Sequence, residues 1–169
     1  MPLFSKMTLD EAFELLLNRK IIASEFKQAS RRIHKLKETD WRIWFGRFLL
    51  SVRSDAENDR FTDAYMCLSE AERLLDEKKD SKEYEKFNSL IDNESLFLVF
   101  KFYYEATGIS VLALFLARFY QNGWGVKADV SKACEYAKVA VNMRETEPAY
   151  LMAQNLLNSL LLQVANTNE

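Results

Sequence analysis

The stretch ARFYQNGWGVKADVSKACEYAKVA, residues 117–140, decides the fold, because it contains two helical patterns and the turn between them. The chain has four glycines, and two of them, Gly123 and Gly125, flank Trp124 here. A phosphate-binding glycine loop follows a strand, whereas a helical pattern precedes this turn. We therefore interpret NGWGV as a joint in which Gly123 ends the first helix in the left-handed conformation. Asp129 is then expected to cap the next helix.

Apolar residues recur at helical spacing through almost the whole chain, which predicts an all-α fold. The scarcity of Gly and Pro (four and two residues) fits long helices with short loops and disfavours a β-rich fold. Length and composition predict a single domain over residues 1–169. Within it we expect helical hairpins and a final capping helix. The hairpins are predicted at about 8–38, 40–79, 81–107 and 109–143, and the capping helix at 147–165.

Local signals mark the starts of three helices. Thr8 followed by Glu11 predicts a capping box. Asp92 or Asn93 is the predicted N-cap of a later helix. Pro148 suits the first turn of the last helix, because the N–H that proline lacks has no partner there.

A phrase of a small residue, Arg and Phe occurs twice, in WFGRFLL around Gly46 and in FLARFYQ around Ala117. In the partner helices, small or β-branched residues recur every 34 or 35 residues, at Ala29, Ala64, Val99 and Ala133. Two antiparallel helices pack closely where small side chains let their backbones approach. The period therefore predicts stacked hairpins, each covering an apolar face of its neighbour. Residues 95–120 are apolar nearly all round, which predicts a place in the middle of the stack.

The segment from about Leu112 to Val141 resembles the Sel1-like repeat, a relative of the tetratricopeptide repeat. Ala137 and Val141 depart from the family pattern, and the other hairpins lack the G-x-G turn. The resemblance implies an α-solenoid that binds other proteins, often in bacteria, and it implies no reaction. The matching residues are Ala117, Tyr120, Gly123, Gly125, Val126, Asp129, Lys132, Ala133, Tyr136 and Ala140.

The family geometry would place the first helix of each hairpin on a concave surface. Arg47 and Arg118 then share one repeat position, and arginine suits bidentate capture of a carboxylate. The alternatives are that each arginine bridges neighbouring hairpins and that Trp124 packs between helices. The predicted partner-binding residues are Asp40, Ile43, Arg47, Leu50, Val111, Leu114, Arg118, Gln121 and Trp124.

The charge is small overall but unevenly distributed. A net charge of −2 argues against a general nucleic-acid binder, which is normally basic. Basic residues gather in residues 19–37, and acidic residues gather in residues 55–80. The basic segment is either a surface that steers an acidic partner or membrane, or a solvated face.

No set of residues in the sequence points to catalysis. His34, the only histidine, has no visible partner at catalytic or metal-ligand spacing, and Cys67 and Cys134 are expected to be buried thiols. The N-terminus lacks the basic region of a signal peptide, and the apolar runs fall short of the roughly 20 residues that span a membrane. We therefore expect no enzyme activity, no cofactor, no metal site, no transmembrane segment and a cytoplasmic location.

The sequence favours a non-enzymatic protein-interaction module that acts as an adaptor, chaperone or inhibitor. One alternative is a dedicated immunity protein or secretion chaperone for a single toxin or effector. Alternatives of another class are a nucleic-acid-binding helical domain, which would use the basic helix, and an all-α enzyme of an unfamiliar kind.

Overall fold

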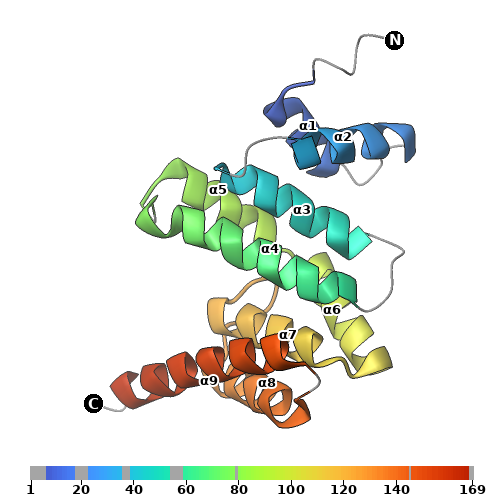
Figure 1. The fold of residues 1–169 in the computed structure, drawn as a ribbon. Coiled ribbons are helices and arrows are strands. Elements are labelled where there is room, and N and C mark those ends of the chain that lie inside the picture. Colours follow the sequence, from blue (N-terminus) through green and yellow to red (C-terminus); the bar gives the residue numbers. More distant parts are fainter. Residues whose placement is uncertain are drawn as a thin grey trace. The chain divides into compact units, whose positions relative to one another are not determined.

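The computed structural model describes residues 7–17, 23–35, 39–53, 59–78, 80–144 and 146–167. Over these residues the chain forms nine α-helices and one 3₁₀ turn, with no strand, and the all-α prediction is confirmed (Figure 1). The elements are α1 (Leu9–Leu17), α2 (Ala23–Lys35), α3 (Trp41–Arg53), α4 (Asp59–Leu75), η1 (Asp76–Lys78), α5 (Lys82–Ile91), α6 (Glu94–Thr107), α7 (Ser110–Asn122), α8 (Val130–Met143) and α9 (Glu147–Thr167).

The chain divides into two compact units, Met1–Lys79 and Asp80–Glu169. The first unit contains α1 to α4 with η1, and the second contains α5 to α9. Each unit is described by itself below. The single domain over residues 1–169 and the solenoid stacking of its hairpins stay predictions.

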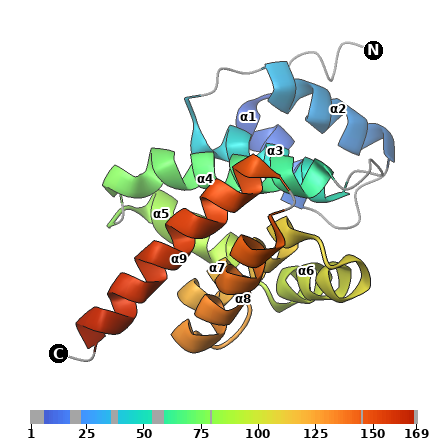
Figure 2. The ribbon, with the colours of Figure 1, turned by 60° about the horizontal axis from the view of Figure 1, so that its bottom comes forward.

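In the first unit, α1 and α2 pack on each other and on α3, and α3 runs alongside α4 (Figures 1 and 2). Gly46 lies where α1 and α2 meet α3. A β-carbon at Gly46 would lie 3.3 Å from both Leu16 Cδ1 and Ile33 Cδ1. The small residue therefore permits the close approach that the sequence predicts. The core cluster here consists of Met7, Ala12, Leu16, Ala29, Ile33, Ile43 and Leu50.

In the second unit, α7 is the most deeply buried helix, and every residue from Val111 to Ala117 is buried. Helices α6, α8 and α9 pack against it. Phe100 of α6 stacks on Phe115 of α7 with ring centroids 4.3 Å apart. The central place predicted for residues 95–120 therefore describes α7. It does not describe α6, which buries one side and exposes the other.

The helices α1–α2, α3–α4 and α7–α8 pack side by side as the predicted hairpins require. Helices α5 and α6 make little contact with each other, although a hairpin is predicted at 81–107. The physical reason is that only Asp92 and Asn93 separate them, and that Phe97 and Phe100 of α6 face α7. Helix α9 packs on α8 and α7, and its role as a capping helix stays a prediction.

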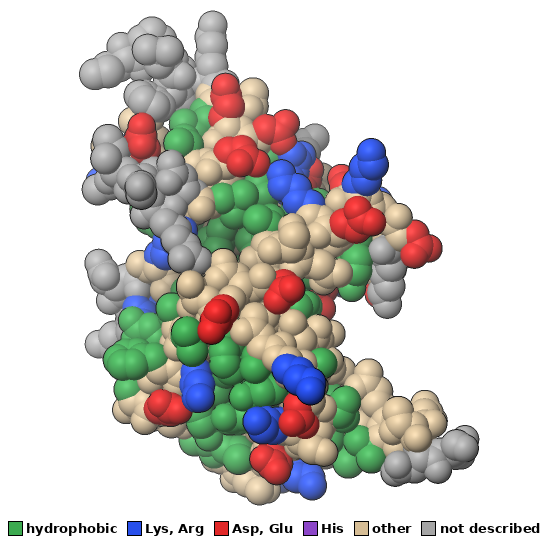
Figure 3. Space-filling model, turned by 180° about the vertical axis from the view of Figure 1, so that it is seen from behind, with side chains coloured by type: hydrophobic (Ala, Val, Ile, Leu, Met, Phe, Trp, Pro, Cys, Tyr) green, Lys and Arg blue, Asp and Glu red, His purple; other side chains and the backbone are tan. Residues whose placement is uncertain are grey.

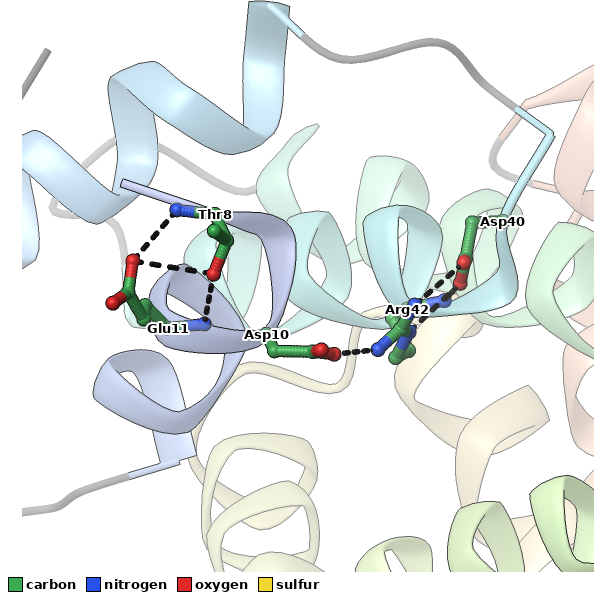
Figure 4. A network of polar contacts seen from close by, with 5 residues as sticks. All are labelled: Thr8, Asp10, Glu11, Asp40 and Arg42. Atoms are coloured by element: carbon green, nitrogen blue, oxygen red, sulfur yellow. Dashed lines mark hydrogen bonds and ion pairs between the residues drawn. The ribbon is translucent and has the colours of Figure 1, made fainter. Parts of the chain in front are cut away.

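The predicted helix starts are confirmed. Thr8 Oγ1 accepts a hydrogen bond from Glu11 N (3.2 Å), and Thr8 N donates to Glu11 Oε2 (2.8 Å), which completes the capping box (Figure 4). Asn93 is the N-cap of α6, and its side chain accepts from two backbone N–H groups of the first turn. Pro148 lies in the first turn of α9.

Candidate functional site

The NGWGV stretch is a joint, as predicted. Gly123 ends α7 in the left-handed conformation, with φ of 70° and ψ of 35°. The N–H groups of Gly123 and Trp124 both donate to the carbonyl oxygen of Phe119. Asp129 then caps α8 by accepting a hydrogen bond from Lys132 N at 3.0 Å. The backbone polar groups of the turn are therefore used to end one helix and begin the next.

Gly125 contacts the two residues that link α5 to α6, and this contact holds the α7–α8 joint in place. Its φ is 69°, and a β-carbon there would lie 2.4 Å from the carbonyl oxygen of Asn93. The N–H of Gly125 donates to Asp92 Oδ1 at 2.7 Å. Sequence reasoning missed this contact, because Asp92 and Gly125 are far apart in the chain. The turn thus connects α7 to α8 and also contacts the link between α5 and α6.

Trp124 packs inside the second unit. Its side chain is 5% exposed, and its ring makes edge contacts with Phe87 (6.2 Å) and Phe119 (6.0 Å). The guanidinium of Arg118 lies 5.6 Å from the centre of the Trp124 ring. Of the two alternatives for Trp124, the structure shows packing.

Arg47 and Arg118 are half-buried and lie over indole rings. Arg47 is 4.8 Å from the centre of the Trp44 ring, and Arg118 lies over Trp124. A guanidinium at this distance from an indole ring is attracted by the electron density of the ring face. Each arginine therefore contacts a tryptophan of its own unit.

Asp40 is occupied within the first unit. Its Oδ1 accepts hydrogen bonds from Arg42 N (2.9 Å) and Nε (3.1 Å), and its Oδ2 accepts from Nη2 (2.9 Å). Arg42 also forms an ion pair with Asp10 of α1 (Figure 4). Asp40 therefore begins α3, and through Arg42 it connects α3 to α1.

The remaining predicted partner-binding residues do not form two open stripes. Ile43 and Leu50 belong to the core of the first unit, and Val111 and Leu114 are fully buried in α7. Gln121 is half-buried and donates to Gln163 Oε1 of α9 at 3.5 Å. The apolar members of both stripes face their own cores, because α3 and α7 are covered by neighbouring helices.

An apolar surface that sequence reasoning missed lies on α6. Leu98 and Phe102, one helical turn apart, are 50% and 65% exposed, and Val99 beside them is 38% exposed. Figure 3 shows hydrophobic side chains reaching the molecular surface in the lower half of the view. The available signal is that α6 is apolar nearly all round, a pattern that also fits a central position in the stack. We call Leu98, Val99 and Phe102 the α6 ridge.

A tyrosine cluster joins α6, α7 and α8. The rings of Tyr120 and Tyr136 stack at 5.7 Å, and Tyr104 makes an edge contact with Tyr136 at 5.6 Å. Lys132 Nζ lies 5.4 Å from the centre of the Tyr120 ring. Burial raises the pKa of Tyr136, and the neighbouring tyrosines and acids raise it further. The phenol therefore stays neutral at neutral pH and serves as packing.

His34 lies at the surface of α2. Partial burial lowers the pKa of His34, and the positive charge of Arg47 lowers it further. In the described part of the chain, no three His, Cys, Asp or Glu side chains come together as a metal ion would require. Among the helices of the described ranges, none combines the length and hydrophobicity that crossing a membrane demands.

No protein-family model, no curated protein and no solved structure matches this chain. The resemblance to the Sel1-like repeat therefore stays a prediction from the residues that carry it.

Proposed function

We propose that this chain binds another protein and acts as an adaptor, chaperone or inhibitor without catalysing a reaction. The observation that carries this proposal is the α6 ridge. A surface helix normally turns its apolar residues toward the core and its polar residues toward water. On α6, Phe97 and Phe100 face the core, and Leu98 and Phe102 face the opposite way.

The α6 ridge is held rigidly, which suits binding. Asn93 caps the start of α6, Gly108 ends it in the left-handed conformation, and the stack of Phe100 on Phe115 fixes it to α7. A preformed apolar surface loses little conformational entropy when a partner binds. An exposed phenylalanine in such a setting is a suitable anchor for a protein interface, because aromatic residues carry much of the binding energy there.

The charged side chains near the α6 ridge indicate which charge the partner segment would carry. Glu94 lies one turn before Leu98, and Glu105 lies on the same side of the helix near its other end. Both carboxylates are exposed, and Lys101, which lies between them on that side, is half-buried. An apolar segment with basic residues beside it would fit this surface. We therefore propose such a segment, in another protein, as the partner of α6.

We also propose that the chain is an α-solenoid related to the Sel1-like repeat. Several of the residues that carry the resemblance lie in one helix–turn–helix joint, which supports this proposal. Gly123 and Asp129 end one helix and begin the next, and Ala133 is buried in α8. Tyr120 and Tyr136 stack on each other across α7 and α8. These roles support the resemblance for this one unit.

Affinity capture with the full chain tests the proposed function. The double variant Leu98→Asp, Phe102→Asp places charge on the ridge and should lose proteins that the wild type retains from its native lysate. The variant Leu162→Asp is the matched control, because Leu162 has the same 65% exposure as Phe102 but lies on α9 among amide side chains. Identical protein profiles for all three chains would refute the role of α6. Retention of no protein by the wild type would refute the function itself.

A further inference from the structure

Helix α2 has one apolar side and one basic side. Ala29 and Ile33 are fully buried in the core of the first unit. The opposite side exposes Lys27, Arg31 and Lys35. These cations are spaced four residues apart, so they follow each other at about 6 Å along the helix. We call Lys27, Arg31 and Lys35 the α2 stripe.

The α2 stripe has no counter-charge in the described residues. None of its three members forms an ion pair there. Glu25, the acidic residue of α2, is two positions before Lys27 and therefore points about 200° away from it. Like charges at a spacing of four residues repel each other, and protein surfaces usually intersperse both signs. Among the described residues, the stripe therefore has no ion-pair partner.

A neighbouring arginine adds to the excess of positive charge on this side of α2. Arg32 borders the stripe, and its Nε is buried with no hydrogen-bond acceptor among the described residues. Because that Nε atom is buried, a partner at the surface of α2 would meet the positive charge of the guanidinium and not this N–H. Arg32 therefore adds positive charge beside the stripe.

We propose that the α2 stripe binds an acidic helix of a partner protein. Carboxylates spaced four residues apart on that helix repeat at the same distance of about 6 Å, so successive pairs form in register. Arg31 can hold a carboxylate in bidentate form. Burial of Ala29 and Ile33 fixes α2 beforehand, so the cations are already arranged when the partner arrives.

The other polyanions fit less well. A nucleic-acid-binding domain is generally basic, whereas this chain carries a net charge of −2. The exposed side of α2 has no aromatic residue on which a base would stack. A helix that lies in a membrane surface inserts an apolar face, and α2 buries that face in its own core.

This inference rests on the proposed function in one respect: both take the partner to be a protein. The two surfaces consist of different residues, because the α2 stripe belongs to the first unit and the α6 ridge to the second. Variants of one surface leave the other intact. The two proposals therefore fail independently.

The test uses the full chain and a labelled synthetic peptide of about 20 residues, long enough to form a helix, with glutamate at every fourth position in an alanine-rich background. Binding is measured by fluorescence anisotropy at low ionic strength and again as salt is added. The double variant Lys27→Glu, Arg31→Glu should weaken binding about tenfold or more, because like charges then face each other. The affinity of the wild type should fall as salt rises.

The matched control is Lys82→Glu, Lys86→Glu on α5, a pair of exposed lysines at the same spacing and with the same change in charge. It should bind the peptide nearly as well as the wild type. Circular dichroism checks that each variant keeps its helix content. Equal weakening by both variants, or no binding of the peptide to the wild type, would overturn the proposal. Tighter binding to duplex DNA or to phosphatidylserine vesicles than to the peptide would overturn it as well.

Discussion

The phrases Gly46–Phe48 in α3 and Ala117–Phe119 in α7 belong to different units but have the same local surroundings. In each, the small residue and the phenylalanine are buried. In each, the guanidinium lies over an indole ring, which is Trp44 for α3 and Trp124 for α7. The small residue and the phenylalanine enter the core in both helices, and the arginine lies near an indole ring in both, although Trp44 precedes Arg47 within α3 and Trp124 follows the end of α7.

The start of α3 and the end of α7 are stabilised by different kinds of contact. Helix α3 begins with side-chain contacts, in which Asp40 and Asp10 both bind Arg42. Helix α7 ends in a backbone turn in which Gly123 and Gly125 have positive φ. Partly exposed charges are screened by water and replaced with little loss. A backbone at positive φ accepts few residues besides glycine. The unit with the glycine turn should therefore be more sensitive to single substitutions.

The largest effect is expected for Gly125→Ala, which should lower the free energy of unfolding by about 3 kcal/mol. The new β-carbon would meet the backbone of Asn93 at 2.4 Å and would also be held at positive φ. Urea denaturation measures the change.

Gly123→Ala is the comparison for Gly125→Ala, because its φ is equally positive but its nearest contact, Ala128 Cβ, is at 3.3 Å. It should cost about 1 kcal/mol or more, since the backbone strain is the same and the contact with Ala128 is much less severe than the clash at Gly125. An equal loss in both variants would show that the contact between Gly125 and Asn93 contributes nothing.

The next prediction compares the free energy of unfolding after substitution of the small residue in each phrase. Ala117→Gly should cost about 1.5 kcal/mol, from lower helix propensity and the loss of a buried methyl group. Gly46→Ala gains propensity, but its methyl group would crowd Leu16 and Ile33 at 3.3 Å. The net change should stay within about 1 kcal/mol, because those contacts are the ends of flexible side chains. A larger loss for Gly46→Ala than for Ala117→Gly in urea denaturation would contradict this.

The features that could be predicted from the sequence are local ones. The capping box at Thr8 and the helix end at Gly123 depend on a few consecutive residues, whose hydrogen bonds follow from residue type alone. Asn93 and Asp92 were equally suitable caps by residue type. Only the fold shows that Asn93 caps α6, while Asp92 accepts from Gly125.

The features that could not be predicted depend on which helices are neighbours. Ile43 and Leu114 have the spacing of an exposed stripe, yet both are buried, because other helices cover that side. Helix α6 is apolar nearly all round, so its pattern did not indicate that Phe102 would face water. A helical period shows which residues share a face, and packing decides which face is covered.

A smaller effect tests the side-chain contacts that begin α3. Asp40→Ala should cost about 1 kcal/mol, because it removes the N-cap of α3 and leaves Asp10 as the remaining acceptor of the Arg42 guanidinium. Asp10→Ala should cost less than about 0.5 kcal/mol, since the side chain of Asp10 is 76% exposed. Urea denaturation at low and high salt measures both, and the effect of Asp10→Ala should vanish at high salt. A larger loss for Asp10→Ala would make the ion pair, and not the cap, the main support of α3.

The smallest effect concerns His34. The charge of Arg47, in the α3 phrase, acts on this histidine, and Arg118 in the α7 phrase has no histidine to act on. Burial and then the charge of Arg47 lower the pKa of His34 from its ordinary value of 6.5. Arg47→Gln should raise this pKa part of the way back, and Arg118→Gln should leave it unchanged. His34 is the only histidine, so its ring protons give one NMR titration curve in each variant. Because the folded pKa is lowered, the unfolded chain takes up the proton first as the pH falls below 6.5, and folding stability is lost there. Arg47→Gln should therefore lose less stability between neutral and mildly acidic pH than the wild type. An unchanged pKa in Arg47→Gln would mean that burial alone sets the titration of His34.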